Sequence, residues 1–194
     1  MKKLSRQDLM NLETYAERRP AFRAEVMEHK KHRRLPIGPE VTLYFEDRLT
    51  IQYQVQEMLR AERIFQGDAI QEELDAYNPL IPDGSNWKAT FMVEIPDVDE
   101  RRRRLTQMIG IEDRVWMQVA GFDRVYAISD EDLEREDDTK TSSVHFCRFE
   151  LDGAMAAAAK AGAAISAGVD HDGYRHEVAP LPEPVRAALV VDLD

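Results

Sequence analysis

Apolar and polar side chains alternate along the chain in short segments, which is the pattern of strands with one buried face. The alternation is clearest at 41–45 and 49–55. Asp47 and Arg48 separate these two segments, so we predict a hairpin whose second strand runs directly into a helix near Gln56. Further strands are predicted at 87–95, 115–120, 124–128, 142–151, 169–171 and 174–178, the last two joined through Asp172-Gly173, a dipeptide typical of type I′ hairpin turns.

Apolar residues at helical spacing predict helices in most of the remaining segments. Ser5 and Asp8 have the spacing of a capping box before a first short helix, and Pro20 suits the first turn of a second helix. Later helices are predicted from near 56, over 68–77, from 97 or 99 onward, over 154–161 and from 184 to 189. Because the strands come as hairpins and not as regular β-α-β units, we expect an α+β protein with a mainly antiparallel sheet covered by several helices.

Length and composition indicate one domain over residues 1–194. Hydrophobic side chains make up 43% of the chain and charged ones 32%, close to the average for globular proteins. No segment approaches the about 20 apolar residues of a membrane helix, and no apolar run follows the basic start as in a secretory signal. We therefore expect a cytoplasmic protein without membrane contact. Cys147 is the only cysteine, and its place in a predicted strand favours a small buried side chain.

The charge is unevenly distributed. The formal net charge is −11, yet residues 1–35 carry ten Lys and Arg against five Asp and Glu and are predicted to form a basic helical segment. Segment 130–141 is predicted to be an acidic loop. The overall negative charge makes nucleic-acid binding unfavourable, although a docking surface on the basic helix stays open as an alternative. Its last cations, Lys30, Lys31, Arg33 and Arg34, also fit the helix dipole.

Two carboxylates fall on the apolar faces of consecutive predicted helices. Glu62 lies within the arc of Val55 and Leu59, and Glu73 lies within the arc of Ile70 and Leu74. Only a short turn around Gly67 separates the helices, so the two carboxylates are expected to approach each other. Buried carboxylates need partners, which leaves three solutions: arginines from elsewhere in the chain, one shared proton, or a divalent metal ion.

Histidines give little further support for a metal site. Neither helix has the Glu-x-x-His motif of carboxylate-bridged di-iron sites. His29 and His32 are three residues apart on the basic helix, where a surface position is favoured. His171 and His176 are expected on one face of the last hairpin, but two histidines alone do not make a specific metal site.

The segments QVQEMLRAERI at 54–64, IQEELDAYN at 70–78 and LIP at 80–82 resemble the signature of a bacterial family known as domain of unknown function 3501. The resemblance extends to IGP at 37–39, AT at 89–90 and VRAAL at 185–189, so it covers nearly the whole chain. The family has no assigned reaction. Its genes often lie beside those of rubrerythrin and an iron-sulfur oxidoreductase, which implies a redox or oxidative-stress role and one of these proteins as partner.

These observations lead to three hypotheses, and they leave open whether the protein is an enzyme. The first is a non-catalytic accessory or binding protein that acts with a redox partner through the region 54–82. The second is a metal-dependent enzyme with Glu62 and Glu73 as ligands, and the third is a nucleic-acid binder through the basic helix. Candidate functional residues are Glu57, Arg60, Glu62, Arg63, Glu73, Tyr77 and Asn78.

Overall fold

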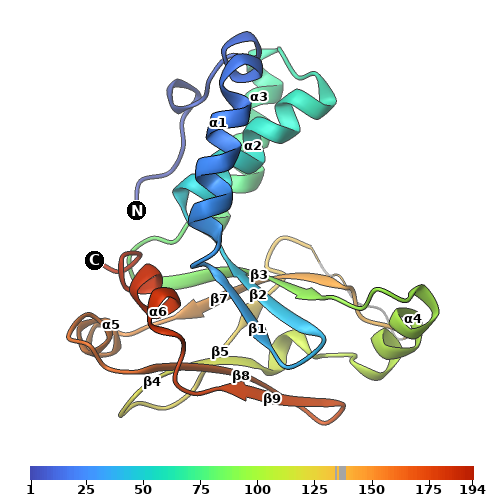
Figure 1. Ribbon diagram of the computed structural model, residues 1–194, viewed down its shortest axis with the longest axis vertical. Coiled ribbons are helices and arrows are strands. Elements are labelled where there is room, and N and C mark those ends of the chain that lie inside the picture. Colours follow the sequence, from blue (N-terminus) through green and yellow to red (C-terminus); the bar gives the residue numbers. More distant parts are fainter. Residues whose placement is uncertain (134, 136–138) are drawn as a thin grey trace.

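The computed structural model describes residues 1–133, 135 and 139–194 (Figure 1). Arg6–Asp8 forms a 3-10 turn that the Ser5–Asp8 capping box opens, and helix α1 follows over Leu12–Lys30. The prediction of two separate helices here is wrong, because Pro20 lies inside α1. The nitrogen of Pro20 carries no hydrogen, so the Ala16 carbonyl lacks its usual partner in the helix. Both Ala16 and Pro20 are exposed. Water can therefore satisfy that carbonyl, and the helix continues.

The predicted hairpin at 41–55 is also wrong in its second half. Strand β2 (Val41–Phe45) is followed by helix α2 (Arg48–Glu62), and Asp47 caps that helix by accepting a hydrogen bond from the backbone nitrogen of Thr50. β2 pairs instead with β1 (Arg34–Ile37), which is followed by Gly38 with φ +71°. Pro36 is tolerated because β1 is an edge strand.

All strand pairs among the described residues are antiparallel, and they form two sheets. The five-stranded sheet has the order β1-β2-β3-β7-β6, with β3 at Asn86–Val93, β7 at Val144–Glu150 and β6 at Ile128–Ser129. The four-stranded sheet has the order β5-β4-β8-β9, with β5 at Val125–Tyr126, β4 at Val115–Val119, β8 at Ile165–His171 and β9 at Tyr174–Val178. The expected α+β class and the predicted hairpins at 115–128 and 169–178 are confirmed.

The part of the chain that the structure describes has two hydrophobic cores. The larger one lies between the two sheets and includes Trp87, Phe91 and Phe149. Three helices flank it: α4 (Val98–Gln107), for which Asp97 provides the predicted cap, α5 (Gly153–Lys160) and α6 (Glu183–Val190). The smaller core lies in a helical arm formed by α1, α2 and α3 (Gly67–Tyr77), which projects from the sheets (Figure 1).

A buried ionic network joins the helical arm to the sheets. The Arg33 side chain, only 3% exposed, donates two hydrogen bonds of 2.9 and 2.7 Å to Asp192, and its Nε lies 2.9 Å from Asp47 Oδ2. His29 Nε2 lies 2.5 Å from the same Asp47 oxygen, so His29 takes part in this network. Buried charges are tolerated only when they are paired in this way.

Within the described residues, no helix has the length and apolar character needed to cross a membrane. Part of the predicted acidic loop 130–141, namely residues 134 and 136–138, lies outside the described residues.

Candidate functional site

Two amide side chains of the signature segments hold the N-terminal segment. The Gln56 amide accepts a hydrogen bond from Met10 N at 2.6 Å and donates one to Met10 O at 3.2 Å. Asn78 makes the same double contact with the backbone of Leu4, at 2.8 and 2.9 Å. The backbone N–H and carbonyl of Met10 and of Leu4 thus bond to a side-chain amide, as they would bond to a neighbouring strand in a sheet. Gln56 and the candidate residue Asn78 therefore stabilise the helical arm.

Glu57 connects α2 to α1. Its carboxylate accepts two hydrogen bonds of 2.8 Å from Arg19 and one of 2.7 Å from the Tyr15 hydroxyl. Hydrogen bonding from the Arg19 guanidinium lowers the pKa of Glu57 to about 2. Arg60 Nε lies 3.4 Å from the same carboxylate. The structure thus places Glu57 in a contact between α1 and α2, and Arg60 pairs with it from within α2.

Glu62 is exposed, so the expectation that it faces inward is wrong. α2 ends at Glu62, and Arg63 takes a left-handed conformation with φ 56°. The spacing predicts an apolar face up to Phe65, but no described element covers the end of α2 after Leu59. Ala61, Glu62 and Arg63 are therefore exposed to solvent.

Glu73 is half-buried on α3. Burial raises its pKa, and the charge of Glu62 contributes less strongly in the same direction. The charge of Glu62 therefore acts on Glu73, while the close approach of the two carboxylates stays a prediction. Among the described residues, neither forms a hydrogen bond or an ion pair, and their role as metal ligands stays a prediction.

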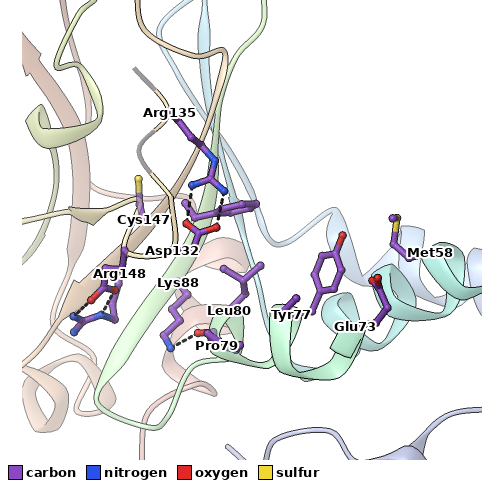
Figure 2. A pocket seen from close by; sticks show the side chains of 13 residues that line it. Met58, Glu73, Tyr77, Pro79, Leu80, Lys88, Asp132, Arg135, Cys147 and Arg148 are labelled. Atoms are coloured by element: carbon purple, nitrogen blue, oxygen red, sulfur yellow. Dashed lines mark hydrogen bonds and ion pairs between the residues drawn. The ribbon is translucent and has the colours of Figure 1, made fainter. Parts of the chain in front are cut away.

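Glu73 and Tyr77 line a cleft of about 470 Å³ between the helical arm and the five-stranded sheet (Figure 2). We call it the helix–sheet cleft. The helix side also contributes Met58, Ala76, Pro79 and Leu80, and the opposite side contributes Lys88, Glu131, Asp132, Arg135, Phe146, Cys147 and Arg148. Figure 2 shows Glu73 and Tyr77 on the helices and Lys88 and Arg148 across from them. The lining is thus partly apolar and carries both signs of charge.

Most charges in the helix–sheet cleft are already paired. Arg135 contacts both oxygens of Asp132 at 2.7 Å, and Arg148 contacts both oxygens of Glu131 at 2.8 Å. Lys88, the cross-strand neighbour of Arg148, donates only to the Pro79 carbonyl, at 2.5 Å, within the described part of the chain. Burial lowers the pKa of Lys88. Lys88 is therefore the cation of this cleft with no carboxylate partner among the described residues.

Cys147 is 3% exposed, so its prediction as a buried strand residue is confirmed. Burial raises the pKa of its thiol to about 12. The thiolate is the reactive form of cysteine, and this environment suppresses it.

A buried histidine in the same strand was not identified from the sequence. His145 is fully buried, and its Nδ1 donates to Asp130 Oδ2 at 2.6 Å. Its Nε2 faces Thr141 Oγ1 at 2.9 Å, the Ser142 carbonyl at 3.1 Å and Glu112 Oε2 at 3.7 Å. The alternation of the strand provides a signal, because 145, 147 and 149 share the inward face. Only the fold brings Glu112 and Asp130 to it.

The family model for proteins of unknown function called DUF3501 matches residues 3–193. The chain belongs to this family. A crystal structure of a protein of unknown function from Burkholderia pseudomallei K96243 is similar to this DUF3501 chain, with 51% identity, full coverage of both chains and a TM-score of 0.94. No curated protein matches the chain.

The remaining candidate sites of this DUF3501 protein lie apart from the helix–sheet cleft. In the basic segment, Arg33 is buried in the ionic network and Lys31 pairs with Glu28 at 2.5 Å, which leaves fewer free cations for nucleic acid than the sequence suggests. On the last hairpin, His171 Nε2 contacts the Ile109 carbonyl at 3.0 Å, while the His176 ring packs against Tyr174.

Proposed function

We propose that this DUF3501 protein is a non-catalytic accessory protein that binds a segment of a partner protein in the helix–sheet cleft. We further propose that the partner belongs to a bacterial redox or oxidative-stress pathway. The position of family genes beside those of rubrerythrin and an iron-sulfur oxidoreductase supports the choice of pathway, by association alone.

The observation that carries the binding role is the composition of the cleft. Its volume of about 470 Å³ lies in the range of ligand sites, and apolar surface from Met58, Leu80 and Phe146 surrounds a few polar groups. Lys88 and Glu73 form no ion pair with any described residue. They are therefore available to opposite charges on a bound segment, while the paired arginines fix the shape of one wall.

The surroundings of the cleft favour a protein segment over a small molecule. Ile128 is 42% exposed, and Leu133 next to Asp132 is 65% exposed. Ile128 pairs with Arg148 across β6 and β7, so the two share one face of the sheet. Exposed apolar side chains beside a partly charged groove are typical of protein interaction surfaces.

The buried thiol fits a recognition role better than a redox reaction by this protein itself. Cys147 borders the cleft, but its side chain faces the core between the sheets and burial raises the pKa of its thiol. Electron transfer would then belong to the partner, and this chain would position or protect it.

The test is affinity capture from native bacterial cells with the wild-type protein and a Tyr77→Ala/Lys88→Ala variant. We expect the wild type to capture a redox protein that binds again after purification. The dissociation constant should be at least about tenfold higher for the variant, since two central contacts are lost. Arg102→Ala is the control, because Arg102 is 78% exposed on α4 and lies outside the cleft. A partner that binds the wild type and the Tyr77→Ala/Lys88→Ala variant equally would contradict the proposal. So would a captured partner that has neither a redox cofactor nor a redox-active thiol.

A further inference from the structure

The buried cluster around His145 joins three segments that are separate in sequence. Glu112 lies in the turn after α4, Asp130 follows β6, Thr141 and Ser142 precede β7, and His145 lies within β7. The side chains of Glu112, Asp130 and His145 are at most 10% exposed. Ligand atoms from these three residues lie within 4.8 Å of one another.

The hydrogen bond to Asp130 determines which ring nitrogen of His145 is available. A carboxylate only accepts hydrogen bonds, so Nδ1 carries the proton that it donates to Asp130 Oδ2 at 2.6 Å. In a neutral ring, Nε2 then presents a lone pair. That lone pair faces the Ser142 carbonyl and Glu112 Oε2, which are electron-rich oxygen atoms. The Thr141 hydroxyl has one proton and can donate it either to Nε2 or to Glu112 Oε2. A cation among these atoms, either a second proton on the ring or a metal ion, would offset their combined negative charge.

The distances around Nε2 fit a metal ion. With bonds of about 2.1 Å, donor atoms around a metal lie about 3.0–3.5 Å apart. Thr141 Oγ1, the Ser142 carbonyl and Glu112 Oε2 lie 2.9, 3.1 and 3.7 Å from Nε2, and Thr141 Oγ1 lies 3.3 Å from Glu112 Oε2. A movement of Glu112 Oε2 by a few tenths of an ångström toward Nε2 would bring the longest of these distances into the range for donor atoms around a metal.

Asp130 stands where the outer partner of a metal-binding histidine is usually found. Such histidines donate their second N–H to a carboxylate, which orients the ring and strengthens the ligand. Asp130 is itself fixed by the backbone nitrogen of Phe146 at 3.0 Å and by Arg135 Nη1 at 3.0 Å.

We infer that this cluster is a structural site for a divalent cation of the zinc or iron(II) type. His145 Nε2 and Glu112 are the side-chain ligands, assisted by Thr141 Oγ1 and the Ser142 carbonyl, and Asp130 orients the ring. One imidazole with oxygen donors suits these metals better than magnesium. The burial of the cluster fits a closed site that holds segments together. Because Asp130 also binds Arg135, the site supports one wall of the helix–sheet cleft.

The test is equilibrium dialysis of the metal-free protein against zinc and against cobalt(II), whose visible spectrum reports nitrogen and oxygen ligands. We expect one equivalent bound by the wild type, an affinity about 100-fold lower in Glu112→Gln and about 10–100-fold lower in Asp130→Asn. The Glu62→Gln/Glu73→Gln variant is the matched control and should retain wild-type affinity. Loss of the metal in this control, with Glu112→Gln unaffected, would overturn the inference.

A second measurement needs only the wild-type chain and so does not depend on whether the variants fold. Crystals soaked in zinc should show an anomalous peak at the zinc edge within bonding distance of His145 Nε2. A peak only at another place, or none at saturating zinc, would overturn the inference.

Discussion

Arg33 and Asp192 form a buried ion pair with two hydrogen bonds that joins the start of β1 to the segment after α6, 159 residues later. Asp47, the cap of α2, contacts the same guanidinium. One arginine thus connects the helical arm, the sheet and the C-terminal segment, and the position of the helices over the cleft depends on it.

Arg33→Ala should lower the free energy of unfolding by about 3–5 kcal/mol, because it leaves two carboxylates buried without their cation. Urea unfolding at neutral pH measures this. Arg34→Ala is the control: Arg34 is 50% exposed and 3.5 Å from Glu94, so the change should stay below about 1 kcal/mol. Equal effects of the two substitutions would contradict the role of the buried network.

Glu57→Gln should cost about 2 kcal/mol of stability at pH 7, since the charged hydrogen bonds to Arg19 are weakened. The pKa of Glu57 falls from 4.5 in the unfolded chain to about 2 in the folded protein. Its contribution is therefore complete above pH 4.5 and is lost as the pH falls toward 2. Urea unfolding at pH 7 and at pH 3 should show the difference between wild type and variant shrinking. A difference independent of pH would argue against the ion pair.

Gln56→Ala should destabilise the protein by about 2 kcal/mol, because both backbone groups of Met10 lose their partner beside a fully buried side chain. Hydrogen exchange at residues 8–12 should increase. Gln71→Ala is the control, since Gln71 is exposed and bonds only to Asp75 on its own helix within the described residues. Unchanged exchange at 8–12 in Gln56→Ala would contradict the proposed attachment.

Cys147 should react slowly with a thiol reagent in the native protein and at the ordinary rate in urea, because its side chain is 3% exposed. The measurement is the time course of labelling at pH 8, with the urea-unfolded chain as the reference. Rapid labelling of the native protein would contradict the burial of this thiol in the core between the sheets.

The fold class and most strands could be predicted because alternation and turn residues act locally. The sequence of residues 49–55 predicts a strand, because Ile51, Tyr53 and Val55 fit a period of two. The same residues also fit a helix with Leu59, and all four are buried in α2. The cap at Asp47 decides between the two, since it satisfies the first free backbone donors of the helix.

The site was only partly predictable for a similar reason. Glu73 and Tyr77 belong to the cleft, as their segment suggested, but the opposite wall comes from β3, from β7 and from the segment after β6, at least 11 residues away in sequence. The periodicity of the helix predicts an inward position for Glu62. It cannot show that the elements packed against α2 end before this residue. His145 lies in a strand whose alternation is plain, yet its partners Glu112 and Asp130 come from turns with no periodic signal.

The most direct test of the binding role is hydrogen exchange of the protein alone and with the purified partner obtained by capture. Binding in the helix–sheet cleft predicts protection of residues 73–80, 86–90 and 144–150, with the rest of the chain little changed. Protection confined to the basic segment 18–34 would contradict it and would move the interaction to α1.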